Sequence, residues 1–483
     1  MMKTKKIVLL DPLTYLNGVP GHYHFVRDWS GARLPADVCL APLDLICAAA
    51  YLRQHGHEVK IIEASIKHIH HPGLVKLIKQ ESPDFVLIPS VNFGIESDKY
   101  LSSLIRQSLP KIKLIFSGAL VTYNPGSVLF DRSADFAAVG ELEIPLLNIL
   151  QEGRGDNVAF LNDKQEIVIG KRRLIDLGEL PLPARDLIDN QAYNYAIFNR
   201  RNPITTMTLS RGCPHSKCEF CHTNLYTLGE IRFRDFDSIA EELREVEFKY
   251  KIGEIFFRDQ AFTANRELVF KLCEFLISQK TALSWRAETR VDLVDKEMLG
   301  LMRRAGCYQL SFGFESCAQK SLDVNNKNIT LAQSKEACRL AGKAGIEVVG
   351  LFLYGMPGDT KETMDRLVRF ALDLKVDYAN FEAIYFMPGS PVYEKMIKSG
   401  KAEFFPKALL KKYVRCAYTT FYLRPEFISK NLLKMVRNGS FFRLGTTLRV
   451  LRGAFLFFLS LGFSPFGMFS KRENPDKEHQ DGC

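Results

Sequence analysis

The chain has 483 residues, of which 46% are hydrophobic and 25% are charged. This composition excludes a wholly disordered chain, and the length suffices for two or three domains with sizeable cores. The formal net charge of +10 is mild for this length and does not predict a nucleic-acid partner. Eleven cysteines without a signal-peptide pattern predict a reducing, cytoplasmic location.

Residues 1–150 are predicted to form a doubly wound α/β domain. Four short apolar runs are typical of buried parallel strands: 5–10, 59–62, 85–88 and 114–116. Such sheets bind ligands outside the carboxyl ends of their strands. Four candidate binding residues follow strand ends here: Ser90, Gly118, Gly140 and Glu141. The two glycines would let a flat ligand approach the backbone. No G-x-G-x-x-G follows the first strand, which disfavours a dinucleotide.

Residues 151–200 are predicted to be a linker, because the stretch 180–186 is rich in proline and therefore stiff. Residues 201–400 then repeat a strand–helix pattern. Six strands are expected near 204–209, 254–258, 283–288, 308–314, 347–354 and 379–386. The helices expected between them include 238–250, 266–280, 296–305 and 331–344.

Three cysteines, Cys213, Cys218 and Cys221, follow the first of these strands within nine residues. Disulfide pairing does not explain them, whereas cysteine thiolates are preferred ligands of zinc and of iron–sulfur clusters. Zinc would require a further ligand, and the nearest, His222, crowds Cys221. A ferredoxin-like cluster would require a fourth, distant cysteine. The remaining alternative is a cluster that three thiolates hold, with one iron left open.

The run Arg211-Gly212-Cys213-Pro214, with Cys218-Glu219-Phe220-Cys221, resembles the cluster motif of radical S-adenosylmethionine (radical SAM) enzymes. It resembles most the subgroup that carries an N-terminal cobalamin-binding domain. The resemblance implies a [4Fe–4S] cluster whose open iron chelates S-adenosylmethionine, and reductive cleavage to a 5′-deoxyadenosyl radical. The family separates its first two cysteines by three residues, and this chain separates them by four.

The resemblance also implies a partial (β/α)6 barrel with its chemistry at the carboxyl ends of the strands. By match of position, Asp259 and Glu315 are expected to bind S-adenosylmethionine, and Arg290 with them. Phe220, Gly355 and Gly358 are further expected cofactor contacts. The alternative for the charged residues is a salt bridge at the barrel rim, and for Phe220 simple packing of the loop.

The first domain resembles the cobalamin-binding domain of the same subgroup, including the Ser-Gly turn at Gly118 and the run Val-Gly-Glu-x-Glu that ends at Glu143. The Asp-x-His-x-x-Gly signature, whose histidine ligates cobalt in other cobalamin proteins, is absent. Cobalamin is therefore expected to bind without a protein histidine on the cobalt.

The last segment, 401–470, is predicted to be helical, beginning with a basic helix over 407–437. It includes a charge-free run over 453–470 that is too short and interrupted to span a bilayer. Its basic flank and phenylalanines are typical of an interfacial helix, with a helical cap on the barrel as the alternative. The final residues, 471–483, are predicted to be a disordered tail.

The function that the resemblance implies is methyl transfer to an unactivated carbon, with a radical SAM cyclisation or rearrangement as the alternative. RNA methylthiolation would require three more cysteines in the first domain, where only Cys39 and Cys47 occur. A non-enzymatic iron–sulfur or zinc protein is the remaining alternative. The expected partners are a lipophilic small-molecule substrate, a reductant such as flavodoxin or ferredoxin, and peripherally the inner face of the membrane, with no nucleic acid.

Overall fold

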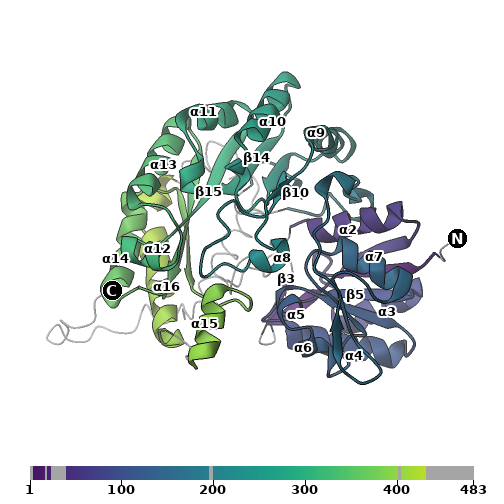
Figure 1. Cartoon of the computed structure of the whole chain (residues 1–483). Helices are drawn as coiled ribbons and strands as arrows, with labels where there is room; N and C mark the ends of the chain where they lie inside the picture. Colours follow the sequence, from purple (N-terminus) through teal and green to yellow (C-terminus); the bar gives the residue numbers. More distant parts are fainter. Residues whose placement is uncertain (1–3, 17–18, 23–39, 195–198, 401–403, 431–483) are drawn as a thin grey trace, which may run out of the picture.

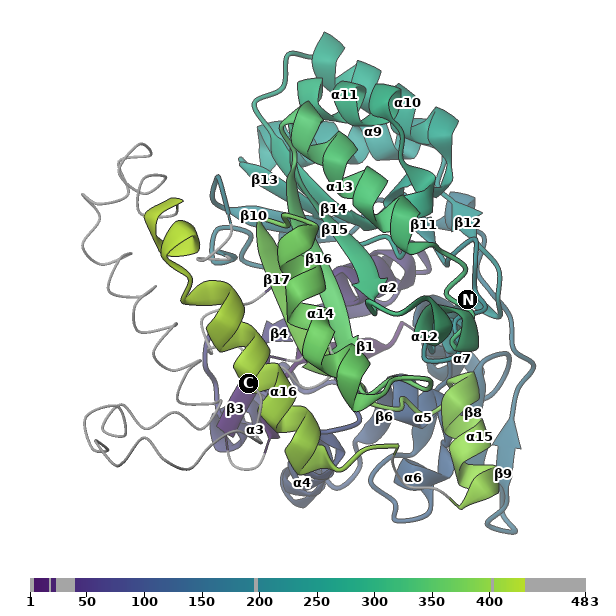
Figure 2. The same cartoon turned by 90° about the vertical axis from the view of Figure 1, so that its left-hand side faces the viewer.

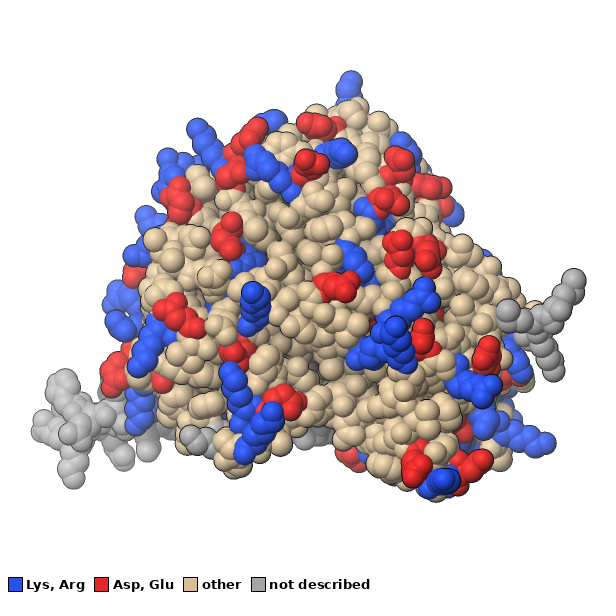
Figure 3. Space-filling view, in the orientation of Figure 1, with Lys and Arg blue, Asp and Glu red and all other residues tan. Residues whose placement is uncertain are grey.

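The computed structural model describes residues 4–16, 19–22, 40–194, 199–400 and 404–430. The chain forms two lobes, each built on a mainly parallel sheet (Figure 1). The run over 441–470 and the tail over 471–483 lie outside the described residues. Over the face that Figure 3 shows, acidic and basic side chains are intermixed and no large area carries a single sign.

The first lobe contains a seven-stranded sheet in the order β4-β1-β5-β6-β7-β8-β9. Its strands are β1 (Lys6–Asp11), β4 (Glu58–Glu63), β5 (Phe85–Pro89), β6 (Lys113–Ser117), β7 (Phe136–Ala138), β8 (Val158–Leu161) and β9 (Ile167–Ile169). The first five in spatial order pair in parallel, and β8 and β9 add antiparallel at the edge. The sheet thus extends beyond residue 150, into the range predicted as linker. A short hairpin, β2 (Leu13–Leu16) and β3 (Val19–His22), follows β1.

Helices cover both faces of this sheet, because its strands are apolar on both sides. They are α2 (Leu43–Gln54), α3 (His71–Glu81), α4 (Ile95–Ser108), α5 (Ala119–Tyr123), α6 (Gly126–Leu129) and α7 (Glu143–Glu152). In β1, Ile7 and Leu9 pack with α2 and α7, whereas Val8 and Leu10 pack with α3 and α4. Alternate residues of one buried strand therefore belong to two separate cores.

The second lobe contains six parallel strands in chain order, as the partial barrel predicts. They are β10 (Ile204–Met207), β13 (Glu254–Phe257), β14 (Ser284–Thr289), β15 (Cys307–Glu315), β16 (Glu347–Tyr354) and β17 (Tyr378–Ala383). The connecting helices are α9 (Phe236–Arg244) with a π-helical turn over Glu245–Lys249, α10 (Arg266–Ser278), α11 (Lys296–Arg304), α12 (Gln319–Val324), α13 (Leu331–Ala344) and α14 (Lys361–Asp373). Each predicted strand in this lobe is confirmed to within a few residues.

Residues 180–193 link the lobes through packing as well as through the chain. Ala184, Ile188 and Tyr193 lie in one apolar core together with residues of the first lobe and with Ile204 and Phe256 of the second lobe. The buried guanidinium of Arg185 donates to Glu242 at 2.5 Å and to the carbonyl of Thr206 at 2.7 Å. The linker is therefore a folded part of the interface.

The C-terminal part that the structure describes packs against β17, the last strand of the second sheet. After α15 (Pro391–Ser399), helix α16 (Lys407–Tyr422) runs beside β17 (Figure 2). The hydroxyl of Tyr422 donates to the carbonyl of Ala379 at 2.7 Å and accepts from its N–H at 3.1 Å. Helix α16 ends ahead of Pro425, which removes a backbone donor, and the backbone is helical again over 425–430. The rest of the predicted helix, up to residue 437, lies outside the described residues. Among the described helices, none is long and apolar enough to cross a membrane.

Candidate functional site

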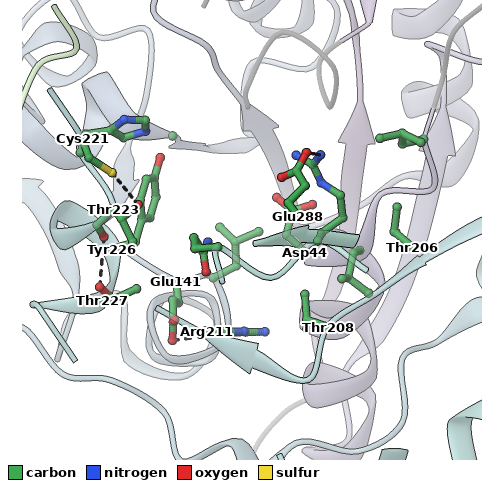
Figure 4. Close-up of a pocket in the computed structure, with 18 of the residues that line it drawn as sticks. Asp44, Glu141, Thr206, Thr208, Arg211, Cys221, Thr223, Tyr226, Thr227 and Glu288 are labelled. Carbon is green, nitrogen blue, oxygen red and sulfur yellow. Dashed lines mark hydrogen bonds and ion pairs between the residues drawn. The ribbon is translucent and has the colours of Figure 1, made fainter. Parts of the chain in front are cut away.

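The carboxyl ends of both sheets border one cavity of about 480 Å³. From the first lobe come Gly118, Gly140 and Glu141, among others. Every strand of the second sheet contributes, itself or just after its end: Thr206, Arg258, Glu288, Glu315, Leu351 and Asn380 are examples. Figure 4 shows Cys221 and Tyr226 on one side and Asp44, Thr206 and Glu288 on the other. A smaller cavity of about 180 Å³ shares Cys221, His222 and Tyr226 with the first.

The three predicted cluster cysteines lie on the loop between β11 (Ser210–Arg211) and α8 (Asn224–Thr227), and all are partly buried. Cys221 borders both cavities. In the part of the chain that the structure describes, no three Asp, Glu, His or Cys side chains are close enough to hold a single metal ion. That spacing is compatible with a cluster, because each thiolate then binds a different iron.

Burial raises the pKa of Cys218 to about 11, although nearby Lys327 favours its thiolate. Burial also raises the pKa of Cys221 above its ordinary value. Metals bind the thiolate form of cysteine. Because burial disfavours that charged form at Cys218 and Cys221, a bound metal cation would be needed to stabilise it. Three partly buried cysteines on one loop fit an iron–sulfur cluster.

The strand end ahead of the cluster loop is fixed by Asp259. Its buried carboxylate accepts hydrogen bonds from the backbone N–H groups of Leu209 and Ser210, and from the Ser210 hydroxyl at 2.6 Å. The next residue, Gln260, accepts from the N–H of Gly212 at 3.0 Å. Asp259 borders neither cavity, so the structure places this predicted cofactor ligand beneath the loop, as its anchor.

Glu315 is brought to the main cavity. It ends β15 with a φ of +62°, and its carboxylate pairs with the buried ammonium of Lys327 at 2.7 Å. A Cβ on Gly313 would lie 2.5 Å from Oε1 of Glu315, so a larger residue there would force the carboxylate to shift. The same ammonium lies 5.8 Å from the ring centroid of Phe220, which borders the smaller cavity. The predicted residues Glu315 and Phe220 are therefore joined through Lys327.

Three other predicted residues lie outside both cavities. Arg290 forms a bidentate ion pair with Asp292 and donates to the carbonyl of Lys327 at 3.1 Å, so it supports the segment that carries that lysine. Gly355 packs against Leu410 of α16, where a Cβ would lie 2.8 Å from that side chain. Gly358 lies against α12, and a Cβ would lie 3.3 Å from the backbone of Ser321. The space that these glycines clear is used by the protein itself.

The floor of the cavity in the first lobe is formed by residues at strand ends. Gly118 has φ +123° and ψ 178°, and a Cβ there would lie 2.0 Å from the carbonyl oxygen of Ser90. Gly140 has φ +90° and donates its N–H to the Thr122 hydroxyl at 3.1 Å. Both glycines border the cavity, so main chain forms this part of its wall, which fits a flat macrocycle such as a corrin. The space that a Cβ would fill is taken by Ser90 and by Arg172. Ser90 borders the smaller cavity.

None of the described histidines in the first 150 residues borders either cavity. The histidine that does is His222, next to Cys221. The prediction that cobalt receives no protein histidine stays a prediction.

Several cavity residues carry no signal in the sequence that could have identified them. Tyr226 and Thr227 are examples, and so is Lys327, which lies outside the cavity lining but pairs with Glu315; each acquires its position only through the fold. In the sequence Arg211 stands out only as part of the cluster motif, yet it also borders the cavity and pairs with the first lobe.

Two family models match the chain. The radical SAM superfamily model matches residues 207–371, and the B12 binding domain model matches residues 32–150. The protein is thus a radical SAM enzyme with an N-terminal B12-binding domain. The cofactors of this class are a [4Fe–4S] cluster, S-adenosylmethionine and cobalamin, and the residues described above fit all three.

Three known proteins are similar to this chain over most of its length. An uncharacterized methyltransferase of Pyrococcus horikoshii, PH0819, is 27% identical over 419 residues, which is 81% of this chain and 90% of that protein. The anaerobic magnesium-protoporphyrin IX monomethyl ester cyclase of Cereibacter sphaeroides is 28% identical over 73% of this chain, but the match spans only 59% of the cyclase. The structure of the radical SAM methyltransferase TsrM from Kitasatospora setae, with cobalamin and a [4Fe–4S] cluster bound, superposes with a TM-score of 0.64, at 15% identity, over 82% of this chain and 78% of TsrM.

Asp98 is fully buried and lies against Ser90, which borders the smaller cavity. One carboxylate oxygen accepts from the Ser90 hydroxyl at 2.6 Å, and the other has no hydrogen-bond partner among the described residues. Burial raises the pKa of Asp98 to about 8. An unfolded Asp has a pKa near about 3.9, so between these values the folded state holds a proton that the unfolded state has lost. Stability from this group therefore falls as pH rises from about 4 to about 8.

We expect Asp98→Asn to raise the melting temperature at pH 8.5 relative to the wild type, and to change it far less at pH 5. The amide keeps the size of the side chain and never ionises. Thermal unfolding of both proteins across this range measures the effect. A difference that does not grow with pH would contradict it, and Asp84→Asn, which is exposed, serves as the control.

Proposed function

We propose that this enzyme transfers a methyl group to an unactivated carbon of a small-molecule substrate. One observation carries the proposal: a single cavity is bordered by the glycine floor of the B12-binding lobe and by Cys221 and Glu315 of the radical SAM lobe. Both cofactors would therefore border the same space. The names of relatives add support, since PH0819 is called a methyltransferase.

The cluster with S-adenosylmethionine would supply a radical that removes hydrogen, and cobalamin would supply the methyl group. Cys213, Cys218 and Cys221 would hold the cluster. Gly118 and Gly140 would admit the corrin to the backbone. The lobes enclose this space on two sides, so the protein shields the reacting groups from water.

Glu315 would bind the positively charged amino group of S-adenosylmethionine. Its carboxylate pairs with Lys327, and a second cation can share its remaining lone pairs. Arg290 would act indirectly, by supporting the segment of Lys327.

We expect Glu315→Gln to keep the iron–sulfur absorbance and to lose most cleavage of S-adenosylmethionine. A hydrogen bond to a charged group contributes about 1.5–3 kcal/mol, so the rate should fall roughly ten- to a hundredfold at subsaturating S-adenosylmethionine. The yield of 5′-deoxyadenosine under dithionite reduction measures it. Glu297→Gln, an exposed residue of α11, is the matched control. Unchanged cleavage by the Gln variant would remove Glu315 from the site.

The reaction type can be tested without knowing the substrate. Reconstituted enzyme with cobalamin and a reductant would be given S-adenosylmethionine alone. Methyl donation yields S-adenosylhomocysteine and radical formation yields 5′-deoxyadenosine, so we expect both to accumulate. Formation of 5′-deoxyadenosine alone, with cobalamin bound, would favour the cyclase or rearrangement alternative, which the Cereibacter relative represents.

The proposal includes a reductant such as flavodoxin or ferredoxin as the electron donor, a cytoplasmic enzyme, and a lipophilic substrate met at the inner face of the membrane. Support for the membrane contact comes from the sequence, which places Arg443, Arg449 and Arg452 beside a run rich in phenylalanine. Binding to anionic liposomes by the full chain, compared with a chain truncated at Asn438, tests this contact. Equal, negligible binding by both would contradict it.

A further inference from the structure

The strand end that leads into the cluster loop is held from two sides. The second lobe holds it through Asp259 and Gln260, which bind the backbone over residues 209–212. The first lobe holds it through Arg211, whose side chain extends across the interface (Figure 4). Arg211 stands two residues ahead of Cys213, so this contact acts at the root of the cluster loop.

Two arginines pair with two glutamates at this point and form an ion-pair network of four side chains. Arg211 forms a bidentate ion pair with Glu143, at 2.7 and 3.1 Å, and lies 3.4 Å from Glu141. Arg232 pairs with Glu141 through both terminal nitrogens. The arginines are register partners on the antiparallel strands β11 and β12 (Arg232–Phe233), and the glutamates are two residues apart.

The acidic residues belong to the segment that forms the cavity floor. Glu141 directly follows Gly140, and Glu143 begins α7 with its side chain 2% exposed. Bidentate pairing fixes direction as well as distance, because the planar guanidinium matches the carboxylate at two points. The four side chains therefore connect the cavity floor at Gly140 to the root of the cluster loop, with no intervening element.

We propose that Arg211, Arg232, Glu141 and Glu143 are positioning residues that set the placement of the cobalamin-binding floor relative to the iron–sulfur cluster. This inference rests on the proposed function, in which both groups serve one cavity. The predicted role of Glu141 as a direct cofactor contact stays a prediction, and both of its carboxylate oxygens already accept from Arg232. Loosening the ion-pair network should leave each cofactor bound and active alone, and should uncouple them.

The test uses the full chain with cluster and cobalamin bound. Glu143→Gln keeps the shape of the side chain and removes the charge. Because small misplacements of reacting groups cost up to about a hundredfold in rate, we expect the ratio of S-adenosylhomocysteine to 5′-deoxyadenosine to change at least about tenfold. The relaxation enhancement of bound Co(II) by the reduced cluster, measured by electron paramagnetic resonance, should change as well, because it depends on the distance between the two centres. Glu143→Asp should restore both readouts in part.

Glu242→Gln is the matched control. Glu242 is as deeply buried and pairs with two arginines, Arg185 of the linker and Arg234, which follows β12. Arg234 also donates to the carbonyl of Thr208, but neither arginine pairs with Glu141 or Glu143 at the cavity floor. We expect a similar fall in melting temperature, with the product ratio and the relaxation enhancement unchanged. If Glu143→Gln fails to fold, Arg232→Lys keeps the charge and gives up the bidentate geometry, and it should still shift both readouts.

Equal behaviour of the Glu143 and Glu242 variants in both readouts would overturn the inference and leave the ion-pair network a structural contact. The electron paramagnetic resonance measurement distinguishes a purely structural ion-pair network from an enzyme that does not transfer methyl groups. A wild-type enzyme that makes no S-adenosylhomocysteine would contradict methyl transfer, while the coupling between the two centres would still test the ion-pair network.

Discussion

Replacing any one of Cys213, Cys218 and Cys221 by Ala should reduce bound iron from about four atoms per chain to nearly none and abolish cleavage of S-adenosylmethionine, since each thiolate holds a separate iron of the cluster. The loss should be complete, because no other cysteine among the described residues stands on this loop. Iron analysis and the visible absorbance of anaerobically reconstituted protein measure the result.

Cys307 and Cys338 give the contrast. Both are buried in the core of the second lobe, and burial raises the pKa of Cys338 to about 12, so these thiols stay protonated. Their Ala variants should lose some stability through a small cavity and keep the full cluster. Loss of iron on changing either would favour the ferredoxin-like alternative, with a fourth cysteine ligand.

Replacing Gly118 by Ala should abolish cobalamin binding while leaving the cluster in place. The backbone at φ +123° and ψ 178° is a conformation that essentially only glycine adopts, and the new Cβ would lie 2.0 Å from the Ser90 carbonyl oxygen. The end of β6 must therefore move, and the cavity lining at Ser117 and Gly118 would be displaced. Titration with hydroxocobalamin, followed by its absorbance, measures binding.

Gly342→Ala is the control. This glycine lies in α13, and the methyl group that the substitution adds would meet nothing within 4 Å, so the change should be neutral or stabilising. Circular dichroism would show that the Gly118 variant keeps its secondary structure. Undiminished cobalamin affinity in a folded Gly118→Ala protein would contradict the role of this floor.

The fold was predictable because its strands are short apolar runs at regular intervals. The run at 85–88 forms a fully buried strand, since parallel strands covered on both faces need no polar alternation. In the run at 347–354 every second residue is buried and the others are partly buried. The edge strand β9 escaped prediction for the opposite reason. Ile167–Ile169 is mostly exposed and adds to the sheet only through its pairing with β8.

The candidate site was predictable where function depends on local sequence, and otherwise not. The cysteine spacing and the glycines after strand ends are local features. The Glu315–Lys327 pair joins the end of a strand to the loop after helix α12, and no sequence pattern predicts this pairing. The place of Asp259 at a strand end predicts a ligand contact, but the backbone of the neighbouring strand occupies its oxygens. Whether a ligand or the protein's own backbone binds such a carboxylate depends on the folded structure, which a local sequence pattern does not reveal.

The apolar core that runs through the linker makes the two lobes a single cooperative unit. Leu45 and Leu146 of the first lobe share it with Ile188, Ile204 and Phe256, so cutting the chain between the lobes would expose these side chains to water. An excised N-terminal fragment should then aggregate, and the intact protein should melt in one transition. In evolutionary terms, the two halves can no longer be exchanged independently between enzymes: a new partner domain must bring matching apolar residues with it.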